Sequence, residues 1–256
     1  MIDRILYSMI YDMQRQDHRV YKAPDCSGLL IDSPQSPLWL WLRDDRRKTD
    51  AQLFFRRFME KYPGSLNGLV ARCDVALACA QLYAKKTGCG FTSHELVAYY
   101  LPVEVNLRQT EGGFLRLANQ SDMPHILKWI NDFYEEALGR RLPSDLAPRN
   151  PHGIISDSAR LFVWCNAAGM RVSMGMISTT IGRTCRFNLI YTPARFRKRG
   201  YGKAIVTGLA LKVRESQIPM LYTDGSNINA NKLYLSIGFK EAGRLREIRF
   251  TPTANA

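Results

Sequence analysis

Five cationic side chains and two glycines lie between Ile190 and Lys203, in the order Ile-Tyr-Thr-Pro-Ala-Arg-Phe-Arg-Lys-Arg-Gly-Tyr-Gly-Lys. A β-favouring run, 187–191, precedes this stretch, and 204–213 follows it with apolar residues spaced by four. Glycines let a ligand approach the main chain, and the first N–H groups of a helix attract an anion. The stretch therefore predicts a strand, a basic glycine loop and a helix that bind a phosphate-bearing ligand.

Two common phosphate loops do not fit this stretch. A P-loop needs G-x-x-x-x-G-K-[ST], which is absent, and a dinucleotide fingerprint that begins at Gly200 would need a glycine where Ile205 stands. The pattern that fits is R-x-x-G-x-G, formed by Arg197, Gly200 and Gly202. Because this pattern is short, a solvated basic turn before a helix is the alternative.

A second pattern follows one predicted helix and one predicted strand later. It is N-x-x-A-x-x-L-Y-x-x-x-G-F, with Asn227, Ala230 and Tyr234 in the asparagine, alanine and tyrosine positions. Both patterns, in this order and at this spacing, resemble those of the GNAT (Gcn5-related N-acetyltransferase) superfamily over roughly residues 113–250. A non-catalytic acyl-CoA-binding or regulatory module is the alternative with the same fold.

The resemblance implies an enzyme, an N-acetyltransferase that moves an acetyl group from acetyl-CoA directly to a primary amine in a ternary complex. Main-chain groups around Ile190 and Thr192 would bind the pantetheine arm, and backbone N–H groups of 198–203 would hold the pyrophosphate. The residues that the resemblance assigns to the cofactor are Ile190, Tyr191, Thr192, Arg197, Lys198, Arg199, Gly200, Tyr201, Gly202, Lys203, Asn227 and Asn231.

The resemblance also implies catalytic residues. Tyr234 would lie by the thioester sulfur and protonate the departing thiolate; the alternative is a core aromatic residue. The glutamate that serves many members as general base would fall near Arg186, so the sequence departs from the pattern there. Glu135 and Glu136 are the replacements we expect, although a solvated helix face is the alternative for at least one of them.

A covalent acyl-enzyme is the other mechanism to consider. Cys165 and Cys185 lie on apolar predicted strands with no histidine nearby in the sequence, so we expect them to serve core packing.

The predicted elements place these residues in an α/β (α+β) fold of the GNAT type, with a mixed, mostly antiparallel central sheet flanked by helices. A helix should begin at 121–124, where a capping side chain precedes proline. Successive strands, joined by hairpins where the chain turns, should follow it before the glycine loop. The predicted strands of the second half are 114–117, 160–165, 171–180, 184–191, 220–223 and one or two within 239–250.

The first half repeats part of this order. Residues 28–101 read as strand, strand, helix, strand, helix, strand, with Leu53, Phe54 and Phe58 facing inward on the first helix and Asp74 capping the second. We therefore expect two domains: a truncated, degenerate GNAT-like region at 1–110 and a catalytic domain at 111–256. The first copy has no glycine between Arg43 and Asp50, so it should bind no CoA. The alternative is that such element orders recur by chance.

Composition limits the other classes of function. A net charge of +13 allows nucleic-acid binding, but only the 195–203 cluster is interleaved with glycine and no nucleic-acid-binding motif is present. The chain lacks C-x-x-C pairs, H-x-x-x-H spacing and a membrane-length apolar run. Because Asp3 and Arg4 interrupt the first apolar residues, we expect no signal segment. We therefore expect a cytoplasmic monomer or homodimer that uses acetyl-CoA and a small-molecule or peptide amine, without metal, membrane or nucleic acid.

Overall fold

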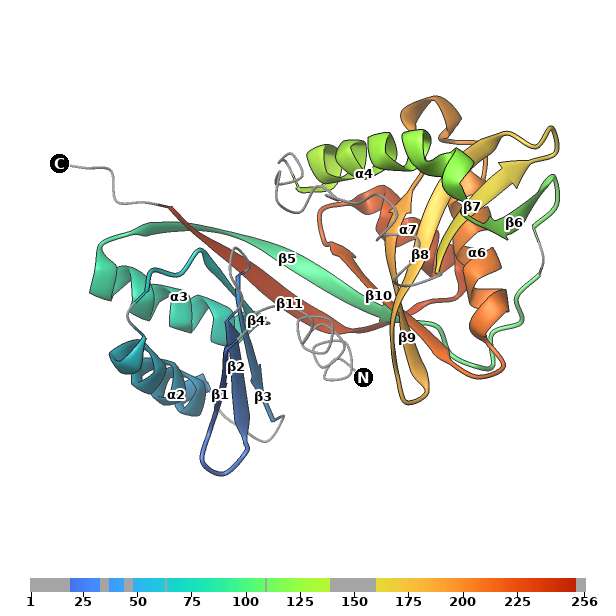
Figure 1. Ribbon diagram of the computed structural model, residues 1–256. Helices are drawn as coiled ribbons and strands as arrows, with labels where there is room; N and C mark the ends of the chain where they lie inside the picture. The colour runs from blue at the N-terminus through green and yellow to red at the C-terminus, as the bar shows by residue number, and fades with distance from the viewer. Residues whose placement is uncertain are drawn as a thin grey trace. The chain divides into compact units, whose positions relative to one another are not determined.

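A computed structural model describes residues 19–32, 37–43, 48–62, 64–108, 110–138 and 160–251, without the side chains of 179–181 (Figure 1). The chain forms two compact units. The first unit comprises Met1–Ala98, Tyr222–Ile228 and Glu241–Ala256, and the second comprises Tyr99–Leu221 and Asn229–Lys240. The amphipathic helix predicted at 2–13 lies outside the described residues.

The sheet of the first unit has the strand order β1-β2-β3-β4-β11-β5. Neighbouring pairs are antiparallel from β1 to β3, β3 and β4 are parallel, and β4 and β11 are antiparallel. A helix, α2, joins the parallel pair. The elements are β1 (Arg19–Lys22), β2 (Gly28–Asp32), β3 (Leu38–Leu42), α2 (Lys48–Lys61), β4 (Gly68–Arg72), α3 (Cys73–Thr87), β5 (Gly90–Tyr100) and β11 (Lys240–Thr251).

The two helices of the first unit bury apolar faces in one core with β2, β3 and β4. In α2, Phe55 and Phe58 are buried, whereas Leu53, which the spacing placed inward, is 52% exposed. The prediction was wrong for Leu53 because the buried stripe of α2 runs through Ala51, Phe55, Phe58 and Met59 and leaves residue 53 on another face. The α3 helix starts after Arg72 without a capping side chain, so the predicted cap Asp74 lies inside the first turn.

The sheet of the second unit has the strand order β10-β9-β8-β7-β6. The pairs from β6 to β9 are antiparallel, and β9 and β10 are parallel. This mixed sheet, flanked by helices, confirms the predicted fold class. The elements are β6 (Gly113–Leu117), α4 (Met123–Leu138), β7 (Leu161–Asn166), β8 (Arg171–Ile181), β9 (Thr184–Tyr191), α6 (Tyr201–Val213), β10 (Ile218–Asp224) and α7 (Ile228–Ile237).

Helices α4 and α6 cover opposite faces of the second sheet, as the alternation along β7 shows. Leu161, Val163 and Cys165 pack with α4 in one core. Between them, Phe162 receives Lys212 of α6 over its ring at 5.6 Å. A Cβ added at Gly208 of α6 would lie 3.4 Å from Trp164, so this helix approaches the sheet closely.

A buried carboxylate fixes the start of α4. Asp122 is fully buried; its oxygens accept from the Asn119 N–H at 2.8 Å and from Arg116 at 2.6 and 2.8 Å, and Arg171 of β8 also pairs with it. Asn119, two residues before the predicted helix start at Ser121, caps the 3₁₀ turn Gln120–Asp122 that leads into α4. Burial alone would raise the pKa of Asp122, but hydrogen bonds from the two arginines and the amide hold it well below its usual range.

Candidate functional site

Strand β9 ends in an irregular segment. Its parallel ladder with β10 joins only Thr184–Arg186 to Ile218–Met220, so among the described residues 187–191 have no ladder partner on that side. Leu189 has a φ of 48°, and its N–H donates to the Asn188 Oδ1 at 2.8 Å. The register with β8 also shifts here. Backbone groups on this edge are therefore available to an extended ligand, because neighbouring strands do not use them.

A tight loop joins β9 to α6. After Pro193 the chain makes a 3₁₀ turn, η2 (Ala194–Phe196), and then takes left-handed conformations at Lys198 (φ 60°) and Gly200 (φ 81°). Gly200 is the N-cap of α6, and no side chain caps the helix. A Cβ at Gly200 would meet nothing within 4 Å. The uncapped first turn therefore faces open space.

The first turn of α6 packs against the end of β9 and against α7. A Cβ at Gly202 would lie 3.0 Å from Leu233 Cδ1 and 3.6 Å from Thr192 Oγ1, so glycine allows this close approach. Lys203 donates to the Ser236 carbonyl at 3.2 Å, whereas Lys198 and Arg199 are exposed beside the loop. The fold thus gathers the residues predicted at 198–203 around one helix N-terminus, where backbone dipoles favour an anion.

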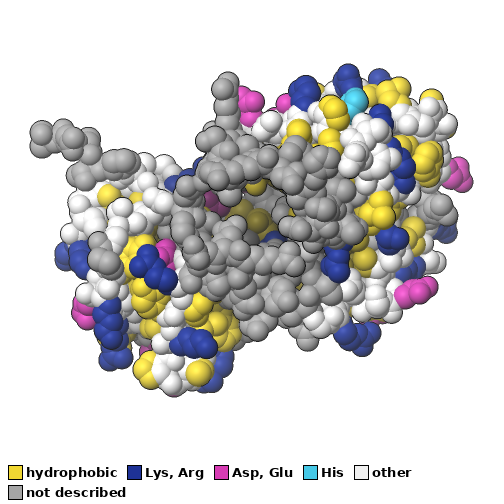
Figure 2. Space-filling model, in the orientation of Figure 1, with side chains coloured by type: hydrophobic (Ala, Val, Ile, Leu, Met, Phe, Trp, Pro, Cys, Tyr) yellow, Lys and Arg dark blue, Asp and Glu magenta, His cyan; other side chains and the backbone are white. Residues whose placement is uncertain are grey.

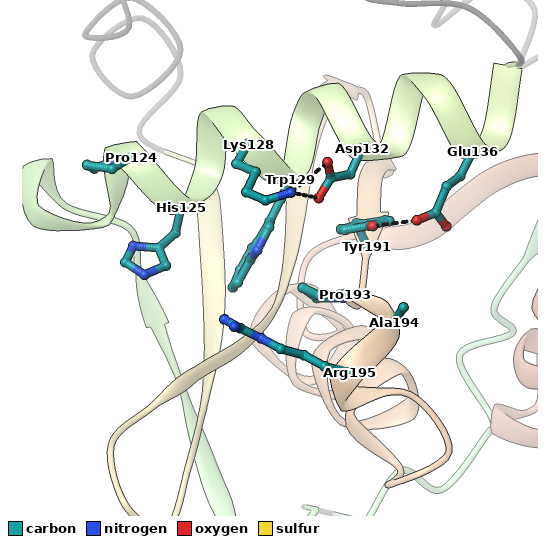
Figure 3. Close-up of a pocket in the computed structure, with 10 residues that line it drawn as sticks. All are labelled: Pro124, His125, Lys128, Trp129, Asp132, Glu136, Tyr191, Pro193, Ala194 and Arg195. Atoms are coloured by element: carbon teal, nitrogen blue, oxygen red, sulfur yellow. Dashed lines mark hydrogen bonds and ion pairs between the residues drawn. The ribbon is translucent and has the colours of Figure 1, made fainter.

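Arg197 joins the loop to α4. Its Nε donates to the Thr192 carbonyl at 2.9 Å, and its guanidinium pairs with Glu136. The same carboxylate accepts from the Tyr191 hydroxyl at 2.8 Å (Figure 3). Burial and this hydrogen bond raise the pKa of Tyr191 above its usual range. A predicted cofactor residue and a predicted candidate base therefore meet in one network.

Tyr234 lies on the buried side of α7. It is 7% exposed, and its ring lies 5.9 Å from the rings of both Tyr99 and Phe239. Burial, with a smaller contribution from Tyr99, raises the pKa of Tyr234 above its usual range, so the hydroxyl keeps its proton at neutral pH. Asn231 of the same helix accepts from the Tyr99 hydroxyl at 2.8 Å.

The remaining predicted residues differ in their surroundings. Glu135 is exposed on α4, and Asn227 lies in the first unit, where its N–H donates to the Asp224 carbonyl at 3.0 Å. Arg186 is buried in β9 and donates to the Ser178 hydroxyl at 3.1 Å. It takes the place of a carboxylate on this strand.

The cysteines considered for acyl transfer lie in the core. Cys165 and Cys185 are each 1% exposed. Burial raises the pKa of Cys185 to about 12, which leaves almost no thiolate at neutral pH. Neither thiol is presented to a ligand.

A pocket of about 620 Å³ lies between α4 and the segment that joins β9 to α6 (Figure 3). Sequence reasoning missed this pocket because its two walls are 55 or more residues apart in the chain. The periodicity of α4 placed Trp129 and Asp132 on a helix but did not show what they face. The lining residues are Pro124, His125, Lys128, Trp129, Asp132, Glu136, Tyr191, Pro193, Ala194 and Arg195.

Metal-binding clusters and membrane-spanning helices are absent from the described part of the chain. No group of three or more histidine, cysteine, aspartate or glutamate side chains there could hold a metal ion, and no helix in that part is long and apolar enough to cross a membrane. On the face drawn in Figure 2, lysine and arginine side chains are scattered among other residues in both units.

Comparisons with known proteins agree with this geometry. Residues 152–249 match a family model described as FR47-like protein. A search of curated proteins finds no match. Two solved structures similar in fold are a GNAT-family acetyltransferase from Colwellia psychrerythraea (TM-score 0.59, 15% identity, 93% of this chain and 87% of that chain) and a GCN5-related N-acetyltransferase from Kribbella flavida (TM-score 0.63, 12% identity, 97% and 95%).

A protein from Drosophila is also similar, with a TM-score of 0.72, 10% identity and coverage of 97% of this chain and 90% of that chain. These structures match both units, but they do not test whether the first unit is a degenerate copy of the second, which stays a prediction. The fold of this protein is that of the GNAT superfamily, which confirms the resemblance of its loop and helix motifs to that superfamily.

Proposed function

We propose that this protein is an acetyl-CoA-dependent N-acetyltransferase that acts on a primary amine. The observation that carries the proposal is the open edge of β9, which leads through a basic glycine loop into the uncapped N-terminus of α6. Such an arrangement suits an extended thiol arm followed by a pyrophosphate. Main-chain groups of 190–192 bind the arm, and the amides of 198–203 bind the pyrophosphate.

The reaction is a direct transfer. The amine nitrogen attacks the thioester carbonyl, the C–N bond forms, and the C–S bond breaks. The Ile190 N–H on the irregular end of β9 stabilises the oxyanion, and Tyr234 gives its proton to the departing thiolate. The raised pKa of Tyr234 supports this role, because the phenol holds a proton at the pH of the reaction.

The amine must lose a proton before or during attack, since its reference pKa is about 10.4. Glu136 already accepts from Tyr191 and pairs with Arg197, so part of its acceptor capacity is already used. Glu135 has an exposed side chain. We assign the proton to Glu135 or to water. A Glu135→Gln variant should lower turnover at neutral pH if the carboxylate takes part.

The test of the proposal is acetyl transfer itself. The full chain is incubated with acetyl-CoA and a panel of primary amines, and CoA thiol release is measured together with the acetylated product. Calorimetry should also show one CoA site per chain. CoA binding without transfer to any amine would favour a non-catalytic acyl-CoA-binding module, and two sites of similar affinity would contradict a first unit that lacks the glycine loop.

A further inference from the structure

We propose that the pocket between α4 and the β9–α6 segment is the acceptor site, and that it takes an amine whose carboxylate lies on the order of 10 Å away along the molecule. A tripeptide and a long-chain ω-amino acid have this character. The inference rests on the proposed function, because it names the acceptor class for the same reaction.

The pocket adjoins the segment assigned to the cofactor. Tyr191 belongs to both: its main chain lies in the open end of β9, and its side chain lines the pocket. Pro193, Ala194 and Arg195 form the wall that continues into the glycine loop. An acceptor bound against this wall therefore lies next to the segment that would hold the thiol arm.

The carboxylates lie toward the C-terminal end of the α4 wall. Glu136 is only partly engaged: one oxygen accepts from Tyr191, the other pairs with Arg197, and 45% of the side chain is exposed. Each carboxylate oxygen has two acceptor positions, so Glu136 can also receive an ammonium hydrogen. Asp132 pairs with Lys128 at 2.8 Å, so that lysine already has an anionic partner.

The opposite end of the pocket is cationic. In Figure 3 the Arg195 side chain extends across the pocket below Trp129 and in the direction of His125. Its guanidinium lies 4.7 Å from the centre of the Phe196 ring, and no carboxylate of the described residues forms an ion pair with it. Arg195 is therefore the cation that a ligand anion would meet.

The spacing of these groups sets the length of the acceptor. Trp129, below which Arg195 reaches in Figure 3, and Glu136 are seven residues apart on α4. A helix rises about 1.5 Å per residue, so this separation is on the order of 10 Å. A chain of three residues in extended form spans about 10 Å. An α-amino acid, whose two charges are adjacent, cannot reach both ends.

The acceptor series tests this inference. Acetyl transfer is measured with ω-amino acids of increasing length and with a tripeptide, each beside its partner in which the carboxylate is an uncharged amide. We expect the longer acids and the tripeptide to have a KM roughly 10–100-fold below those of their amides, the difference a charge-assisted hydrogen bond provides. The shortest acids should show no such difference.

Arg195→Gln should abolish this discrimination and leave the acetyl-CoA affinity, measured by calorimetry, unchanged. Arg183→Gln, which changes an exposed arginine in the β8–β9 turn, is the matched control and should keep the discrimination. Equal KM values for acids and amides would overturn the inference, as would an Arg195→Gln variant that loses acetyl-CoA binding. If the acceptor site is right but the proposed function is wrong, the result is different. Calorimetry would then show that the tripeptide binds to the CoA-bound chain, and no acetyl transfer would be detected.

Discussion

Each unit contains a strand, a helix and a parallel strand followed by a second helix, but the two crossovers end differently. In the first unit β3 and β4 pair through Leu38 and Leu69 and through Trp39 and Val70, with α2 between them. In the second unit β9 and β10 pair over three residues, with α6 between them. Beyond these short ladders no further described residues of either strand pair are joined, so the end of a ladder alone does not make a site.

The two units differ in how the residues beyond the paired part of the strand are packed. The end of β3 carries Leu40 and Leu42, which are 2% and 6% exposed and belong to the core with α2 and α3. The end of β9, residues 188–190, is only half-buried and is followed by the glycine loop. The same supersecondary unit serves as core in one place and as a candidate binding edge in the other.

The second helices carry the same contrast. Both α3 and α7 contain a Leu-Tyr pair, with Tyr83 and Tyr234 buried at 7% exposure. The Tyr83 hydroxyl accepts from the Leu66 N–H at 2.8 Å and so serves a loop of its own unit. The Tyr234 hydroxyl is the group that we assign to the thiolate. The Leu-Tyr sequence alone therefore does not assign a role to the tyrosine; its contacts do.

The largest effect should follow a change in the loop that distinguishes the two crossovers. Gly200→Trp places a large side chain in front of the α6 N-terminus, so CoA affinity, measured by calorimetry, should fall by at least roughly 100-fold through lost hydrogen bonds to the phosphate. The left-handed conformation adds strain of about 1–2 kcal/mol.

Gly169→Trp controls for that strain, because Gly169 has a φ of 75° in the β7–β8 turn and also has nothing within 4 Å of its Cβ position. This control should lose similar stability and keep CoA binding. Unchanged affinity in a folded Gly200→Trp variant would refute the loop assignment.

The two tyrosines should separate when each loses only its hydroxyl. Tyr234→Phe should lower turnover by roughly 10²–10⁴-fold, the usual contribution of acid–base assistance, with little change in CoA affinity. Tyr83→Phe should leave turnover unchanged but cost about 1–3 kcal/mol of unfolding free energy, because the buried Leu66 N–H loses its acceptor. Near wild-type turnover in Tyr234→Phe, on an acceptor of the protein, would show that water or another group protonates the thiolate.

The helix starts of the two units should respond differently to acid. The pKa of Asp122 is lowered in the folded state, so its contribution is present above the unfolded pKa of about 3.9 and is lost as pH falls below that value. Asp122→Asn should cost about 3 kcal/mol at neutral pH, since it leaves two partly buried arginines without their carboxylate.

Asp74→Asn is the matched control at the start of α3, where Asp74 is 55% exposed and 3.7 Å from Arg72. It should change the unfolding free energy, measured by urea titration, by less than about 1 kcal/mol. Equal losses in the two variants would remove this difference between the units.

The smallest effect should come from the contact between α4 and the loop. Glu136→Gln keeps the shape of the side chain but removes the charge that pairs with Arg197. Both side chains of this ion pair are nearly half exposed. An exposed ion pair contributes about 0.2–1 kcal/mol, so CoA affinity should fall by no more than about fivefold. A much larger loss would mean that Glu136 itself, or Arg197 held by it, contacts the cofactor.

The sequence predicted most of what depends on local pattern. The strands at 28–32 and 184–191, the helix behind the glycine loop and the fold class are confirmed, because turn residues and apolar periodicity specify them directly. The errors at Leu53, Asp74 and Ser121 concern helices that were themselves predicted. In one case the wrong residue was placed inward, and in the other two the helix start was placed at the wrong residue. Helix ends depend on the capping residues, and the buried face depends on the packed partner; apolar spacing alone gives neither.

Long-range features were not accessible in this way. Nothing in the sequence signals the left-handed Leu189, because it arises from the register shift between β8 and β9. The contact of Glu136 with Arg197 joins residues 61 positions apart. Leu53 and Phe55 show that the same difficulty exists over short distances in the sequence. Which of the two side chains faces the core depends on the elements that pack against α2.

The division of the chain between the two units has a consequence for how the protein can be taken apart. Strand β11 pairs with β4 in the first unit, although most of the chain between them lies in the second. A cut after residue 110 would leave β11 of the fragment 111–256 without its β4 partner, and β4 of the fragment 1–110 unpaired on the edge that β11 occupies. An isolated edge of this kind favours association with other chains. Neither fragment should therefore behave as an autonomous monomer, and the intact chain should melt with strongly coupled transitions.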